Sequence, residues 1–140
     1  MLPKLIYRSL SATLLLGALL APLPAAAQDS DETAVALKIG PVSCFMVRRP
    51  DGEWSAKQRV NHVQDVFAKH LGAAQGNFST RRRGDRVNIF LNGDFVIGVT
   101  PVDAKATGFA DAPSLAKIWI ERLRKAFDET HVRPVPERER

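Results

Sequence analysis

Cysteine is nearly absent from this chain of 140 residues, in which Cys44 is the only one. An internal disulfide is therefore excluded, and packing has to stabilise the fold. Cys44 lies in the apolar run Val42–Val47, where a buried, small hydrophobic side chain is its expected role. We assign it no catalytic function.

Long hydrophobic runs are also scarce. The main apolar run, Leu10–Leu20, has 11 residues, whereas a membrane-spanning helix needs about 20. Lys4 and Arg8 precede this run, and three alanines ending at Ala27 follow it, which is the pattern of a secretory signal peptide. The sequence predicts that residues 1–27 are a signal peptide cleaved after Ala27. The mature chain is then periplasmic or secreted.

Neither sign of charge is in large excess. The formal net charge is +5 for the whole chain and falls to +3 without residues 1–27. This excess is small for a nucleic-acid-binding protein, and export would separate the chain from nucleic acid. We expect no nucleic-acid partner.

Recognisable catalytic and metal-binding motifs are missing as well. No serine lies in a nucleophile-elbow motif, and His62 and His70 are eight residues apart, whereas a metal pair on a helix needs a spacing of three or four. The sequence predicts a protein that is not an enzyme, with no catalytic residue, cofactor or metal. Catalytic triads assemble in space rather than in sequence, so a small hydrolase or metal-binding protein stays open as an alternative.

Capping and turn signals divide the mature chain into elements. Ser55 and Gln58 form a capping box, and Thr100 with Pro101 marks a second helix start. Gly84-Asp85 and Asn92-Gly93 separate three strands, since Asn-Gly favours a two-residue hairpin turn. The expected strands span 42–47, 77–82, 86–91 and 94–99, and the expected helices span 55–71, 100–107 and 114–128.

These elements predict an α+β fold. A mainly antiparallel four-stranded sheet, in the order β-α-β-β-β-α-α, has its helices packed on one face. Apolar stripes on the two longer helices face the sheet, while Arg59 and the other polar residues of the first helix point away from it. The predicted core contains Phe67, Ile89, Ile97, Trp119 and Phe127.

One domain is expected, at residues 39–130. Residues 28–38 are predicted to be a flexible leader, because they begin with the polar stretch QDSDET. Residues 131–140 contain two prolines and no apolar periodicity, so a disordered tail is predicted there.

Arginines mark the candidate binding site. Arg81, Arg82, Arg83 and Arg86 flank the predicted Gly84-Asp85 turn, and Arg48 with Arg49 follows the first strand. Such a cluster can bind an anion, an anionic lipid surface or the acidic surface of a partner. The alternative is a solvated strand edge whose charge prevents pairing with other chains.

A resemblance to a known family appears late in the chain. The segments Val99–Ala104 (VTPVDA) and Leu115–Trp119 (LAKIW), with Gly108 between them, are similar to the periplasmic domain that precedes the membrane part of some bacterial mechanosensitive ion channel proteins. The similarity extends back through Arg59, Ser55 and Phe45 to Gly40, and covers residues 39–127. It implies a fold and a periplasmic compartment but no catalytic residues. No membrane span is predicted after residue 27, so ion conduction is not implied.

The leading hypothesis is an exported, periplasmic, non-enzymatic binding or accessory domain for an envelope or membrane protein, with a channel as one such partner. The alternative is a peripheral binder of anionic envelope lipids or polymers that uses the arginine cluster. The sequence does not indicate the oligomeric state.

Overall fold

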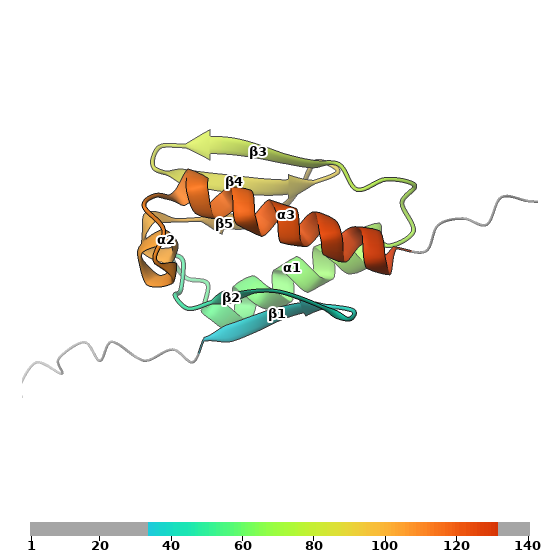
Figure 1. Cartoon of the computed structure of the whole chain (residues 1–140), viewed down its shortest axis with the longest axis horizontal. Helices are drawn as coiled ribbons and strands as arrows, with labels where there is room; N and C mark the ends of the chain where they lie inside the picture. The colour runs from blue at the N-terminus through green and yellow to red at the C-terminus, as the bar shows by residue number, and fades with distance from the viewer. Residues whose placement is uncertain (1–33, 132–140) are drawn as a thin grey trace, which may run out of the picture.

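The computed structural model describes residues 34–131, which form two antiparallel sheets and three helices (Figure 1). Strands β1 and β2 form a hairpin, and β3, β4 and β5 form a second sheet in that order. The bounds are β1 Val35–Ile39, β2 Val42–Val47, α1 Ala56–His70, β3 Phe78–Arg83, β4 Arg86–Leu91, β5 Asp94–Val99, α2 Pro101–Thr107 and α3 Ala112–Thr130. The predicted signal peptide, and residues 132–140 of the predicted tail, lie outside the described residues.

The predicted α+β class is confirmed, but the single four-stranded sheet is wrong. Strand β2 pairs with β1 and not with the β3–β5 meander. Residues 35–38 were expected to belong to a flexible leader, yet β1 occupies them because Leu37 and Ile39 alternate toward the core. Gly40, at a φ of 53°, makes the tight turn into β2. Strand β2 therefore forms its backbone hydrogen bonds with β1, its neighbour in the sequence.

The meander of β3, β4 and β5 follows the prediction. Asn92 and Gly93 both have positive φ, at 50° and 86°, as a two-residue hairpin turn requires. Val87, Ile89 and Leu91 are buried on one face of β4, and the residues between them are half-buried on the other. The sheet therefore has one face toward the helices and one outer face.

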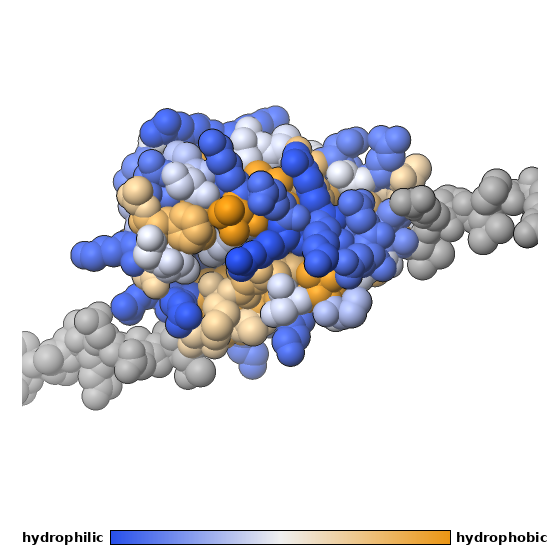
Figure 2. Space-filling view, in the orientation of Figure 1, coloured by the Kyte–Doolittle hydropathy of each residue, from blue (hydrophilic) through white to orange (hydrophobic). Residues whose placement is uncertain are grey.

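Helices α1 and α3 pack against both sheets and share one core with them. The five predicted core residues are all buried, and the Trp119 ring stacks on Phe45 with 4.1 Å between centroids. Helix α3 starts two residues before the predicted position, because the Asp111 side chain accepts a hydrogen bond from the Ser114 N–H. Figure 2 shows the face that α3 crosses, where long hydrophilic side chains surround smaller hydrophobic areas.

None of the helices within residues 34–131 combines the length and the apolar character that a membrane crossing requires.

Candidate functional site

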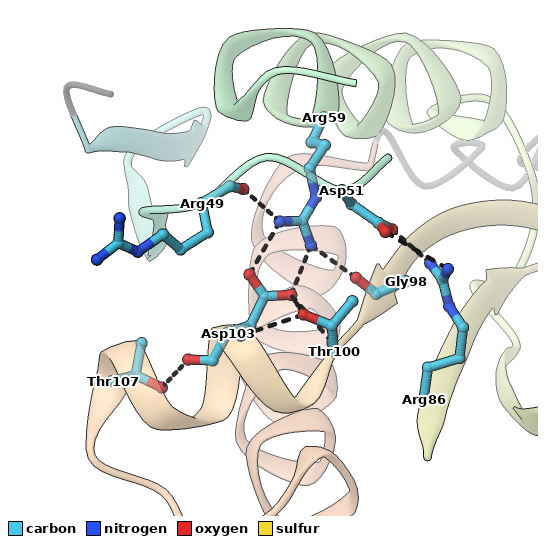
Figure 3. Close-up of polar contacts among 8 residues, drawn as sticks. All are labelled: Arg49, Asp51, Arg59, Arg86, Gly98, Thr100, Asp103 and Thr107. Carbon is cyan, nitrogen blue, oxygen red and sulfur yellow. Dashed lines mark hydrogen bonds and ion pairs between the residues drawn. The ribbon is translucent and has the colours of Figure 1, made fainter. Parts of the chain in front are cut away.

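A buried ion pair lies where α1, α2 and β5 meet (Figure 3). The Arg59 guanidinium binds the Asp103 carboxylate through two hydrogen bonds, of 2.9 Å to Oδ1 and 2.7 Å to Oδ2. Each side chain is only 2% exposed. The expectation that Arg59 points away from the buried side of α1 is wrong, because an ion pair with good geometry allows a charge to be buried there.

Both charges have further partners. Arg59 also donates to the carbonyl oxygens of Arg49 at 2.6 Å and Gly98 at 2.7 Å. Asp103 Oδ2 accepts hydrogen bonds from the Thr100 N–H at 3.0 Å and the Thr100 hydroxyl at 2.9 Å, within the capping box that begins α2. These bonds join α1, α2, β5 and the loop after β2. Thr100 and Asp103 of the VTPVDA segment therefore meet Arg59 in one hydrogen-bond network.

A second ion pair lies beside the first, nearer the surface. Arg86 on β4 binds Asp51 in the loop after β2. Its guanidinium covers Gly98, where an added Cβ would collide with it. The same loop is closed by two backbone hydrogen bonds between Asp51 and Trp54, of 2.9 and 3.0 Å. Arg86 therefore fixes the loop against the outer face of the sheet.

A pocket of about 270 Å³ opens between this loop and β5. Trp54 is 42% exposed at the pocket, and its ring meets the edge of His62, with 4.9 Å between centroids. His62 Nε2 lies 3.0 Å from the carbonyl oxygen of Phe95. No motif in the sequence predicts this pocket. Its lining residues are Asp51, Gly52, Trp54, Arg59, Arg86, Phe95, Val96, Ile97 and Gly98.

The six arginines predicted as one binding cluster have different surroundings. Arg86 forms an ion pair with Asp51. The Arg49 carbonyl oxygen accepts a hydrogen bond from Arg59. Arg48 is exposed and lies 3.8 Å from the Met46 sulfur. The remaining three, Arg81–Arg83, are exposed in succession on β3 and form no ion pair with any residue in 34–131.

Successive side chains of β3 point to opposite faces of the sheet. The Arg81 guanidinium lies over the Phe90 ring on the outer face, 5.1 Å from its centroid. Arg82 is paired in register with the buried Val87, so it points toward the face that α3 covers. Gly84, at a φ of 64°, makes the turn after Arg83, as the sequence predicts for Gly84-Asp85.

A groove of about 440 Å³ lies between β3, β4 and α3. Apolar side chains contribute to it from Val87, Ala116 and Ile120, and basic side chains contribute from Arg82, Lys117 and Arg124. Glu121 is the one acidic residue of the lining. Thr80 and Pro113 complete it.

The other candidate groups have structural roles. Burial raises the pKa of the Cys44 thiol to about 11, which confirms a buried hydrophobic role. His70 Nε2 lies 2.8 Å from Asp94 Oδ2, and Lys69 lies 2.6 Å from the same oxygen. These hydrogen bonds, first that from Lys69, lower the pKa of Asp94. No set of three or more potential metal ligands clusters anywhere in residues 34–131.

Comparison with known proteins gives a family but no activity. Residues 42–130 match a domain of unknown function, DUF8459, and the chain belongs to this family. The match runs from β2 to the end of α3, so it includes both ion pairs, the Trp54 pocket and β3. No curated protein and no solved structure matches the chain. None of these findings connects it with mechanosensitive channels.

Proposed function

We propose that this chain is exported to the periplasm, where it acts as a non-enzymatic domain that binds an envelope protein with an acidic surface. One observation carries the proposal: Arg81, Arg82 and Arg83 are exposed beside a partly apolar groove and form no ion pair among residues 34–131. The signal-peptide pattern supports the export.

The charge of this surface favours an acidic partner. With Lys117 and Arg124, the three arginines of β3 make five basic side chains, and Glu121 is the one acid in the groove lining. Facing basic and acidic surfaces accelerate association and select against basic competitors. The groove adds apolar surface, which contributes affinity that charge alone does not supply.

The arrangement favours a protein over a lipid surface. Arg81 and Arg82 point to opposite faces of the sheet, so a flat membrane surface contacts one of them more readily than both. A protein segment can follow the strand and enter the groove. The resemblance of the sequence to the periplasmic domain of some mechanosensitive channel proteins further supports a membrane protein of the envelope, such as a channel, as the partner.

Crosslinking in intact cells followed by mass spectrometry tests this proposal. A variant with Arg81, Arg82 and Arg83 changed to glutamate is compared with a control in which the exposed Lys38, Lys57 and Lys105 are changed to glutamate, for the same change in net charge. We expect the wild type and the control to capture the same envelope protein and the β3 variant to lose it. Equal capture by both variants, or turnover of a substrate by the purified chain, would overturn the proposal.

Vesicle sedimentation tests the lipid alternative. The purified chain is mixed with phosphatidylglycerol vesicles and with phosphatidylcholine vesicles at low and high salt. We expect no difference between the β3 variant and the control in either mixture. Salt-sensitive binding to phosphatidylglycerol alone that the β3 variant loses would replace the protein partner with an anionic lipid.

A further inference from the structure

We infer that the partner binds as an extended segment that adds a strand to the free edge of β3. This inference rests on the proposed function, because it states how the same surface takes hold of its partner. An extended peptide that adds to a sheet edge gains affinity from backbone hydrogen bonds and specificity from its alternate side chains.

The two edges of the three-stranded sheet differ. At β5, side chains of α1 lie against the outer edge: Arg59 donates to the Gly98 carbonyl oxygen, and His62 Nε2 lies 3.0 Å from that of Phe95. At β3, pairing is with β4 only, and no other strand of residues 34–131 lies beside it (Figure 1). The β5 edge is therefore occupied and the β3 edge is open.

The register shows which backbone groups of β3 are free. Arg83 and Arg86 flank a two-residue turn and therefore form a hydrogen-bonded pair. Steps of two residues along the strands lead from this pair to Asn77 and Asn92, where the Asn92 N–H donates to the Asn77 carbonyl oxygen at 2.9 Å. Hydrogen-bonded pairs alternate along an antiparallel ladder, and the β3–β4 register runs without a bulge. The N–H and C=O groups of Phe78, Thr80 and Arg82 consequently point outward, where an added strand would meet them.

Side chains on the added strand would alternate between two environments. On the face toward α3 they would enter the groove, with its apolar Val87 and Ile120 and its basic margin. On the outer face they would lie beside Arg81 and Arg83. The segment that fits both is extended, with apolar residues on one face and acidic residues on the other.

A second copy of this chain does not fit the same edge. Two β3 strands side by side would bring Arg81, Arg82 and Arg83 of one copy near those of the other, and like charges on neighbouring strands are destabilising. We therefore commit to an acidic segment of a different protein as the occupant.

The test uses a synthetic probe, acetyl-Val-Glu-Val-Glu-Val-Glu-amide, and the purified wild-type chain. A second probe carries the same side chains but is N-methylated at alternate residues, so that it cannot pair through its backbone. We expect the methylated probe to bind at least about tenfold more weakly, since it loses several backbone hydrogen bonds. Hydrogen exchange at the amides of Phe78, Thr80 and Arg82 should slow with the first probe and not with the second.

A substitution in β3 tests the same backbone pairing. Thr80→Pro removes one outward N–H without removing a bond to β4, and an edge strand accepts proline at such a position. With its melting temperature checked, this variant should lose binding by a similar factor, whereas Thr80→Val should keep it. The methylated probe keeps the test valid if Thr80→Pro does not fold.

The outcomes separate this inference from the proposed function. If both probes bind wild type equally but the glutamate variant of Arg81–Arg83 binds neither, the surface attracts acidic segments without strand pairing, and only this inference fails. If the glutamate variant binds as well as wild type, the inference and the proposed function both fail. Self-association of the chain through β3, seen by sedimentation, would overturn the inference in favour of a second copy.

Discussion

Arg59 and the arginines of β3 show two opposite uses of one side chain. Arg59 is buried and donates to one carboxylate and two carbonyl groups, whereas Arg81, Arg82 and Arg83 are exposed and have no ion-pair partner among residues 34–131. Leaving a buried charge unpaired is costly, but a solvated charge needs no partner. The fully bonded Arg59 holds α1, α2 and β5 together, while the three arginines of β3 keep their charges in solvent.

The largest expected effect comes from breaking the buried pair. Asp103→Asn leaves the Arg59 charge without its carboxylate, so the free energy of unfolding should fall by about 3–5 kcal/mol. Urea denaturation followed by circular dichroism measures this change. The double variant Arg59→Met, Asp103→Leu should lose less than Asp103→Asn alone, and wild-type stability of Asp103→Asn would show that the ion pair is not buried in solution.

A smaller loss is expected at the position between the two ion pairs. Gly98→Ala places a methyl group against the end of the Arg86 side chain, which can move aside by loosening its ion pair with Asp51, so the cost should be only about 1 kcal/mol. The thermal midpoint measures the effect. Gly52→Ala is not a suitable control because Gly52 has a φ of 59°, but Gly72→Ala meets open space and should leave the midpoint nearly unchanged.

An exposed ion pair should respond to pH and little to substitution. The pKa of Asp94 is lowered in the folded state, first by the hydrogen bond from Lys69 and then by His70, so its contribution is present at neutral pH and is lost as pH falls through that lowered pKa. The stability difference between wild type and Asp94→Asn should therefore shrink below about pH 4, the usual pKa of a free aspartate. Urea midpoints from pH 7 to pH 3 measure it; a difference that stays constant would contradict the assignment.

The smallest effect on stability is expected on β3. Changing Arg81, Arg82 and Arg83 to serine should alter the free energy of unfolding by less than about 0.5 kcal/mol per site, because exposed residues without ion pairs contribute little. The same urea measurement applies. A clear gain in stability would indicate that repulsion among the three arginines destabilises the fold. A large loss would show that these arginines stabilise the fold, as Arg59 does.

The parts of the fold that could be predicted from the sequence are those that depend on local signals. The Ser55–Gln58 capping box, the Asn92-Gly93 turn and the Thr100 cap each act within a few residues, and all are present in the structure. Strand pairing is not local in this sense. The polar residues before β1 concealed the alternation of Leu37 and Ile39, and without β1 the strand β2 was assigned to the wrong sheet.

The site was predicted less well because it depends on contacts between distant segments. Arg59 and Asp103 are 44 residues apart, and the helical periodicity that placed Arg59 outside the apolar stripe cannot reveal a buried carboxylate on another helix. The Trp54 pocket is likewise built from a loop and a strand that only the fold brings together. The basic binding surface stays a prediction for Arg81–Arg83; only their exposure is shown, and it follows from a strand of consecutive charged residues.

The occupied outer edge of β5 has a consequence for assembly. A protein that grows into fibres by joining sheet edges needs two open edges on the same sheet, one to give and one to receive. With Arg59 and His62 bonded to β5, the three-stranded sheet offers β3 alone. If a partner strand adds to this sheet, the fold therefore leaves room for one such segment per copy.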